Sequence, residues 1–417
     1  MPRGAPAPGR GAATFARRAG PIETYFLSFN LYALGNGLVA VFLNLFFLAN
    51  YSYLAVLSFQ LATYVTALAA YLCAGYALPR YRPKHLYVLG LALFVFVLFD
   101  MLSASGFLSN AFVFGTLWGA ATGVFYAGNN PMMHDITRRA DRTSFVAVNN
   151  LLTGVVSLIA PVSAGALIQF STFPGVERYL WDFAVTAGFF ALAAITVRRV
   201  HDDAPPPADY SLARTVRGPG PGYARFQLFF EASQLFAIPF GIILPIYVFQ
   251  VTGSYLLTGA YASYLVLLSV LANFGFRRGF RPEGGFAPIA VAGIVLSSLL
   301  LFTRWDPLVC TFLFAGCYTV LSTPLNNLAM VEFMQRIDRD PSLDRVPVWA
   351  NREFHLGVGR IVVLGLLIVL SLYVVRNSSD LVFLLPFLSL YAVSYFGILP
   401  PRPHPEVPLR PAAGNNG

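Results

Sequence analysis

Long apolar stretches follow one another along nearly the whole chain, and short polar segments separate them. A helix needs about 20 apolar residues to cross the roughly 30 Å of hydrocarbon in a bilayer. The stretches lack the alternation that marks a barrel strand, so we interpret them as helices. Twelve spans are predicted, at residues 23–48, 52–78, 86–107, 110–132, 146–170, 179–198, 224–250, 255–276, 284–303, 307–331, 353–375 and 380–399.

The composition agrees with this pattern. Of the 417 residues, 57% are hydrophobic and only 11% are charged, whereas soluble domains carry about 25% charged residues. So few charges cannot cover an ordinary water-facing surface of this size. The chain is therefore predicted to be an all-α polytopic membrane protein whose main surroundings are the lipid bilayer.

The net charge of +9 is explained by where the basic residues lie. Of the 28 lysines and arginines, 24 fall in the two terminal segments and in the loops after even-numbered spans. Basic residues collect in cytoplasmic loops of membrane proteins. This pattern predicts a multi-pass protein of the bacterial inner membrane with both termini in the cytoplasm, and it requires no nucleic-acid partner.

Polar, proline- and glycine-rich segments divide the chain near its middle and at its ends. The segment 199–223 is interpreted as a flexible cytoplasmic linker. The two ends are predicted to be disordered. The resulting division is a disordered N-terminus at 1–20, a six-helix bundle at 21–198, the linker, a second six-helix bundle at 224–400, and a disordered tail at 401–417.

An internal repeat relates the two halves at an offset of 197 residues. Residues 129–142 read NNPMMHDITRRADR and residues 326–339 read NNLAMVEFMQRIDR. Six of the 14 positions are identical, among them the asparagine pair and the final Asp-Arg. Polar matches at fixed spacing are uncommon between unrelated apolar helices, so an internal duplication is predicted.

A shorter match supports the repeat. Tyr81-Arg82-Pro83 follows the second span, and Phe280-Arg281-Pro282 follows the eighth. Both matches place corresponding segments on the same side of the membrane. The predicted repeat is therefore parallel, with spans 2 and 4 equivalent to spans 8 and 10.

These features together resemble the major facilitator superfamily: twelve spans, cytoplasmic termini, a central linker and parallel six-helix halves. The loop after the second span carries Gly75, Arg80 and Lys84 at the spacing of the family motif. Pro79, Arg82 and Pro83 depart from that motif. Ala160-Pro161 and Gly165 in span five are similar, in part, to a motif of its antiporter branch. The resemblance implies alternating access to a site between the halves, lined by spans 1, 4, 7 and 10.

Motifs for other chemistry are missing from the sequence. It contains no Walker lysine, no HExxH and no CxxC, and its three cysteines lie in predicted spans. We therefore predict no catalytic residue, no metal site and no cofactor, and the protein is not expected to be an enzyme.

Two acidic residues inside spans are candidates for proton coupling. Glu231 lies about eight residues into span seven, with Gln234 on the same helix face three residues later. Asp100 lies near the outer end of span three. Ionisable residues within a membrane are costly and are often functional. The alternative is that each carboxyl simply bonds to a neighbouring helix.

Other polar and aromatic residues in the spans are candidates for contact with a solute. Packing between helices is the alternative for each of them, because amides and hydroxyls also join membrane helices. The predicted substrate-binding residues are Asn30, Tyr126, Asn129, Glu231, Gln234, Tyr318 and Asn326.

The repeated motif suggests a pair of matched cytoplasmic latches. In this hypothesis the asparagines cap helix ends, and the acid and arginine of each copy pair across the halves. Arg360 in span eleven is expected to snorkel or to pair with Glu353. The predicted gate residues are Arg80, Arg82, Asp135, Arg142, Glu332 and Arg339.

The favoured function is secondary active transport of a small neutral or amphipathic solute, with proton-coupled efflux preferred over uptake. Few charges and many aromatics in the lining spans argue against a multiply charged substrate. A sugar or metabolite uptake permease and a lipid flippase are the alternatives. The expected partners are a small-molecule substrate and the bilayer, and the protein is expected to be a monomer.

Overall fold

The computed structural model describes residues 19–102, 110–136, 142–173, 175–200, 210–218, 220, 223–277, 286–303, 305–339, 345–373 and 378–398. All regular secondary structure in these ranges is helical. Eleven helices are long and apolar enough to cross a membrane, and a shorter apolar helix covers Phe286–Phe302. The twelve predicted spans are thus present, the ninth of them at reduced length.

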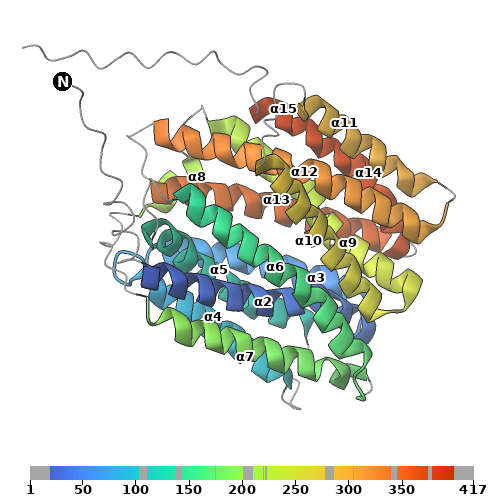
Figure 1. Ribbon diagram of the computed structural model, residues 1–417, viewed down its shortest axis with the longest axis horizontal. Coiled ribbons are helices and arrows are strands. Elements are labelled where there is room, and N and C mark those ends of the chain that lie inside the picture. The colour runs from blue at the N-terminus through green and yellow to red at the C-terminus, as the bar shows by residue number, and fades with distance from the viewer. Residues whose placement is uncertain are drawn as a thin grey trace, which may run out of the picture.

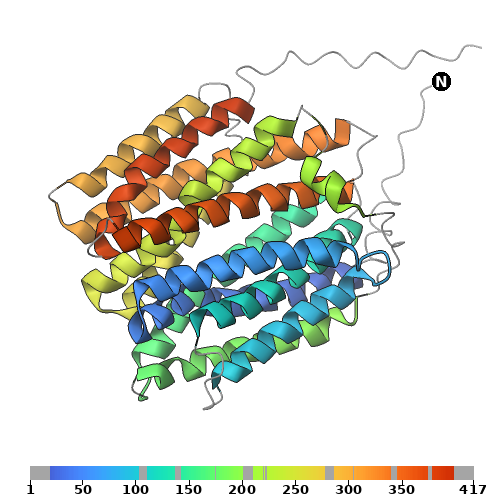
Figure 2. The ribbon, with the colours of Figure 1, turned by 180° about the vertical axis from the view of Figure 1, so that it is seen from behind.

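The helices form two bundles side by side, coloured blue to green and yellow to red in Figures 1 and 2. The first bundle contains α2 (Ala19–Asn50), α3 (Tyr53–Gly75), α4 (Pro83–Leu102), α5 (Ala111–Ile136), α6 (Arg142–Gln169) and α7 (Leu180–Val197). The second contains α9 (Ala224–Thr252), α10 (Tyr255–Arg277), α11 (Phe286–Ser298) with η4 (Leu299–Phe302), α12 (Pro307–Arg339), α13 (Arg345–Tyr373), and a last span built from η5 (Ser378–Leu384), α14 (Leu385–Leu388), η6 (Ser389–Ser394) and α15 (Tyr395–Ile398).

A short helix, α8 (Leu212–Arg217), lies in the linker at one end of both bundles, on the left in Figure 1. We call this the linker end of the molecule and the opposite one the distal end. The sequence predicted a flexible linker throughout 199–223, and this helix corrects that prediction. Residues 201–209, like nearly all of the two terminal segments, lie outside the described ranges.

Glycines bring α3 and α5 close together in the first bundle. Gly115, Gly119 and Gly123 face the backbone carbonyls of Phe59, Thr63 and Ala67, and a Cβ at any of the three would overlap them. The spacing of four residues puts all three glycines on one helix face. Small residues that allow backbones to approach are the usual basis of helix packing in membranes. Gly316, which lies 197 residues after Gly119, makes a similar close contact between α12 and Tyr264 of α10.

The asparagine repeat has a structural counterpart. Asn130 of α5 donates its amide to the Tyr71 hydroxyl of α3 at 3.3 Å. At the equivalent place Asn327 of α12 donates to the Asn273 side chain of α10 at 2.6 Å. In both halves the second asparagine thus joins the fourth helix of its bundle to the second, as a parallel repeat requires.

The first asparagine of each pair does not follow this symmetry. Asn129 accepts a hydrogen bond from the Tyr25 hydroxyl of α2, the first span, at 3.0 Å. Asn326 accepts one from the Tyr395 hydroxyl, in the twelfth span, at 2.6 Å. All four asparagines lie inside α5 and α12, so the prediction that they cap helix ends is wrong.

The two bundles meet mainly along two helix pairs, α3 with α13 and α6 with α10, and to a smaller extent between α2 and α9. At the distal end the Gln169 side chain accepts a hydrogen bond from the Tyr255 backbone N–H at 3.0 Å. Gly165 of α6 packs against the Tyr255 carbonyl, and Gly259 of α10 packs against Pro161. The motif that resembled the antiporter branch therefore lies in the contact between the halves.

Candidate functional site

A line of polar side chains crosses the contact between α9 and α13 inside the second bundle. On α9 it contains Gln227, Glu231 and Gln234, and on α13 Asn351, His355 and Arg360. On α9 the spacings of three and four residues keep the set on one helix face. On α13 the spacings of four and five residues turn Arg360 away from Asn351 and toward α3. We call these six residues the polar ladder.

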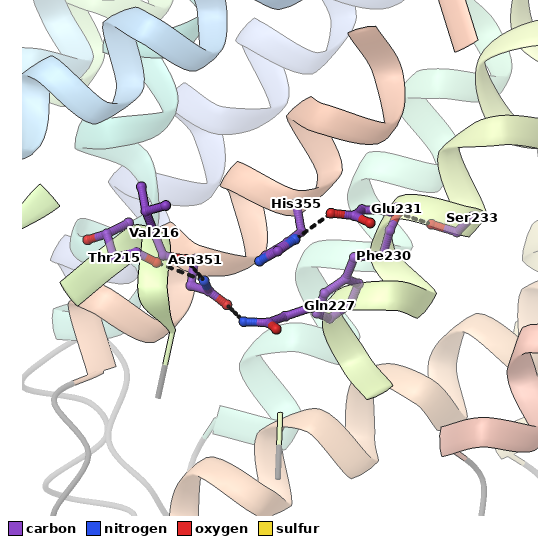
Figure 3. Close-up of polar contacts among 8 residues, drawn as sticks. All are labelled: Thr215, Val216, Gln227, Phe230, Glu231, Ser233, Asn351 and His355. Carbon is purple, nitrogen blue, oxygen red and sulfur yellow. Dashed lines mark hydrogen bonds and ion pairs between the residues drawn. The ribbon is translucent and has the colours of Figure 1, made fainter. Parts of the chain in front are cut away.

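Three side-chain contacts make up the ladder, two of which Figure 3 shows. The Gln227 amide donates to the Asn351 side-chain oxygen at 3.0 Å. His355 Nδ1 lies 2.6 Å from a Glu231 carboxylate oxygen. The Arg360 Nε–H donates to the Gln234 side-chain oxygen at 2.9 Å.

Gly359 makes this arrangement possible. A Cβ at position 359 would lie 2.5 Å from the Glu231 backbone oxygen, so any larger residue would separate α9 from α13. The glycine therefore sets the distance over which Glu231 can reach His355.

The contact between Glu231 and His355 is suited to holding a proton. The Glu231 side chain is 35% exposed and that of His355 is 14% exposed. The short distance requires a shared proton: either the imidazole donates to a carboxylate oxygen, or a protonated carboxyl donates to Nδ1. The buried Nε2 of His355 has no hydrogen-bond partner among the described residues. A proton gained or lost here changes both the charge and the hydrogen bonding between the helices.

Arg360 lies where the bundles meet. It is 13 residues from either end of the span Pro347–Tyr373, and Tyr64 is likewise central in Tyr53–Gly75. The Arg360 guanidinium lies over the Tyr64 ring, 5.2 Å from its centre, so this cation–π contact joins α13 to α3. The prediction that Arg360 pairs with Glu353 is wrong, because Glu353 forms its ion pair with Arg352 at 2.6 Å.

The ladder connects to the linker at one end. The Asn351 amide donates to the Thr215 backbone oxygen of α8 at 2.7 Å (Figure 3). The Tyr210 ring packs against Gly75 and lies edge-on to Tyr76, 4.9 Å away, at the end of α3. Burial there raises the pKa of the Tyr210 hydroxyl above its ordinary value. The linker therefore contacts both halves.

Replacing Asn351 by alanine is expected to release α8. The side chain loses its hydrogen bonds to α8 and to Gln227, each worth about 1 kcal/mol. Trypsin should then cut after the exposed Arg217 roughly tenfold faster, because cleavage follows local opening. Asn50→Ala is the control, since that side chain bonds only within α2. An unchanged cleavage rate would show that Asn351 does not hold the linker.

The other predicted substrate residues are spread over both bundles. Asn30 donates to the Phe26 carbonyl of its own helix and accepts from Thr153. Tyr126 is 37% exposed and its hydroxyl contacts that of Tyr32 at 3.4 Å. Asn129 and Asn326 are held by the tyrosines described above. For these two asparagines the structure favours the packing alternative.

Tyr318 and Asp100 lie away from the ladder. Tyr318 is buried, and its ring packs on Phe236 and Phe240 while its hydroxyl contacts that of Tyr391 at 3.2 Å. Asp100 lies at the distal end of α4, a helix that packs on α5 and α7. The structure therefore brings Glu231 and Gln234 together, but it does not bring Asp100 to them.

The predicted gate is described only in part. Arg80 and Arg82 are exposed in the turn that follows α3, and Glu332 is half-buried on α12. The side chains of Asp135, Arg142 and Arg339 lie outside the described part of the structure.

Sequence reasoning missed His355 and the contacts of Arg360. A signal was present, since Asn351, Arg352, Glu353, His355 and Arg360 all lie in one long and mostly apolar span. The cavity-lining spans that the resemblance implies include span seven but not span eleven, which supplies the partners of Glu231 and Gln234.

Comparison with known proteins agrees with the fold of two helical bundles. Residues 25–336 match the Major Facilitator Superfamily. The chain belongs to this superfamily. As a member of the superfamily it is a multi-pass membrane protein with a transporter fold, and this bears out the resemblance seen in its sequence.

Solved structures of superfamily transporters superpose on nearly the whole chain. A bacterial homologue of the iron transporter ferroportin, in its inward-facing state, has a TM-score of 0.64 at 14% identity, covering 91% of this chain and 97% of that one. A bacterial homologue of the human drug peptide transporters PepT1 and PepT2 has a TM-score of 0.68 at 9% identity (91% and 95%). The fucose:proton symporter FucP of E. coli has a TM-score of 0.61 at 15% identity (91% and 96%). No curated protein matches the sequence. At these identities the superpositions establish the fold alone.

Proposed function

We propose that this superfamily member is a proton-coupled secondary transporter that moves a small amphipathic solute by alternating access. The contact between Glu231 and His355 carries the proposal, because it joins two titratable side chains between α9 and α13 of the second bundle, and α13 packs on the other half. Imidazole is the side chain whose charge most readily changes between pH 5 and pH 8.

Protonation of this pair can change how the halves pack. The ladder holds α9 against α13, and α13 contacts α3 of the other half. A proton on the pair alters the charge carried by α9 and α13, and α13 also carries Arg360 with its contact to Tyr64. The contacts between the halves then differ in strength between the two protonation states. A proton shifts a conformational equilibrium only if its binding free energy differs between the conformations, and this difference in contacts would provide that.

The surroundings of the ladder suit an amphipathic solute. Tyr64 and the partly exposed Tyr126 lie on the first bundle near Arg360. Rings of this kind offer apolar faces together with hydroxyl groups. We further propose that the transporter lies in a bacterial inner membrane, with the linker end in the cytoplasm, since basic residues collect at that end.

Spin labels on the two halves test the coupling without a known substrate. Tyr51 and Trp305 are exposed at the distal end of the first and second bundle, 52% and 68% respectively. Both would be replaced by spin-labelled cysteines after Cys73, Cys310 and Cys317 are changed to alanine. Pulsed electron resonance is expected to show a different main distance at pH 5.5 and pH 8. The same distance distribution at both values would exclude coupling between protonation and rocking of the halves.

A further inference from the structure

We infer that Arg360 binds a carboxylate of the transported solute, so that the substrate is a monoanion with an apolar or aromatic body. We also infer that this anion and the proton on Glu231 and His355 are bound together. The inference rests on the proposed function and adds the chemical class of the substrate and the direction of coupling.

Arg360 carries hydrogen-bond donors for which the described part of the chain offers no acceptor. A guanidinium has five N–H groups, and among the described residues only the Arg360 Nε–H finds an acceptor, the Gln234 side chain. The described ion pairs of α13 are Arg352 with Glu353 and His355 with Glu231. Arg360 takes part in neither.

An unbalanced charge at this depth calls for an anion. Arg360 lies at the middle of an apolar span, where an arginine is costly unless it pairs or faces water. Gln234 and Tyr64 offer it a dipole and a ring face, and neither carries a countercharge. The two terminal nitrogens of a guanidinium form a fork that matches a carboxylate, and such charge-assisted bonds are the strong ones.

The residues around the guanidinium indicate what the rest of the solute resembles. Tyr64 covers one face of Arg360. Tyr126 belongs to the first bundle and is 37% exposed, and its hydroxyl is close enough to Arg360 to interact with the charge of the guanidinium. A carboxylate bound at Arg360 would therefore hold an apolar or aromatic body against tyrosine rings of the opposite half.

The local charges indicate one negative charge on the solute. Arg352 and Glu353 cancel each other, and Arg225, Glu332 and Arg336 lie toward the linker end of α9 and α12. With one proton shared by Glu231 and His355, that pair has no net charge. Arg360 then gives the site a net charge of +1. Without the proton, the negative pair offsets Arg360 and the attraction for an anion falls.

Proton and anion binding are therefore linked, and the linkage is reciprocal. The protonated transporter binds the anion more tightly, and the anion holds the proton in place. The two then move in the same direction, so symport replaces the proton exchange and efflux that the sequence favoured. A 1:1 complex also leaves the site with no added charge.

Matched acids and amides test the inference on the purified, full-length transporter. The probes are benzoate, phenylacetate and hexanoate, each paired with its primary amide, and thermal unfolding reports binding because a ligand stabilises the folded state. At least one acid is expected to bind about tenfold or more tightly than its amide. Arg360→Gln should remove this preference, and Arg360→Lys should keep part of it.

The pH dependence of the unmodified protein gives a second readout that needs no variant. These acids are ionised between pH 6 and pH 8, yet their affinity should rise up to about tenfold for each unit by which pH falls. The affinity of the amides should stay constant. Phenyl phosphate, a dianion near neutral pH, should bind more weakly than phenylacetate.

The outcomes separate this inference from the proposed function. The anion site is overturned if the acids bind no more tightly than their amides, or if Arg360→Gln still prefers the acids. Either result would do so even where pH still changes the distance between the spin labels. If the acids bind more tightly than the amides but their affinity does not change with pH, the anion site stands and co-binding of the proton is overturned. If phenyl phosphate binds more tightly than phenylacetate, the inferred monoanionic carboxylate is wrong and the substrate class is a phosphate ester.

Discussion

Replacing Glu231 by glutamine is expected to abolish the pH-dependent change in distance between the two halves. Glutamine keeps the size of the side chain and can still bond to His355, but it cannot bind the proton. The transporter should then give one distance distribution at both pH 5.5 and pH 8. Infrared difference spectra between these pH values should also lose the carboxyl signal of Glu231, which changes with pH whether the shared proton lies on the carboxyl group or on the imidazole.

Glu353→Gln is the matched control for this prediction. Glu353 lies on α13 two residues before His355, and it pairs with its neighbour Arg352 rather than with the ladder. This variant should keep both the distance change and the pH-dependent carboxyl signal. A carboxyl signal that persists in Glu231→Gln would mean that another carboxyl group responds to the proton. Asp100→Asn would then test the second acid predicted from the sequence.

Replacing Gly359 by valine is expected to be the most destabilising single change at the site. The new side chain would meet the Glu231 backbone and the Gln234 side chain, which a Cβ would approach to 2.5 and 3.1 Å. The helices must then separate, and overpacking of this kind costs about 1–3 kcal/mol. The midpoint of thermal unfolding in detergent should fall by several degrees, and the contact between Glu231 and His355 should be lost with it.

Gly365 provides a control on the same helix. A Cβ at position 365 meets nothing within 4 Å, so Gly365→Val should leave the unfolding midpoint unchanged or raise it slightly. If both valine variants unfold at the same temperature, close packing of α9 on α13 is not what Gly359 provides. The pH response of the spin-labelled protein should disappear in Gly359→Val and persist in Gly365→Val.

Several features of the transporter could be derived from residue order alone. Spans of about 20 apolar residues are needed wherever a helix crosses a bilayer, so composition and length predicted the helices. The parallel repeat was visible because polar residues of both copies keep their spacing. In the structure Asn130 and Asn327 join equivalent helices, which agrees with the predicted pairing of spans.

The candidate site was derived only in part. Glu231 and Gln234 stood out because polar side chains are rare in span seven, and their spacing placed them on one face. Their partners lie 124 and 126 residues away, and no local pattern specifies which of the other spans packs on α9. The same holds for Asn129 and Asn326, whose partners Tyr25 and Tyr395 no local pattern specifies.

The amino-acid sequence by itself thus determined that the chain crosses the membrane about twelve times in two related halves, because the cost of exposing polar groups to lipid acts on each segment separately. The tertiary structure decided which polar groups meet. Gly359 has no side chain, and this lets α13 approach α9 closely enough for His355 to reach Glu231. Arg360 has its place over Tyr64 because the two bundles pack along α3 and α13. Contacts of this kind depend on the distance and rotation between helices, which only the packed molecule defines.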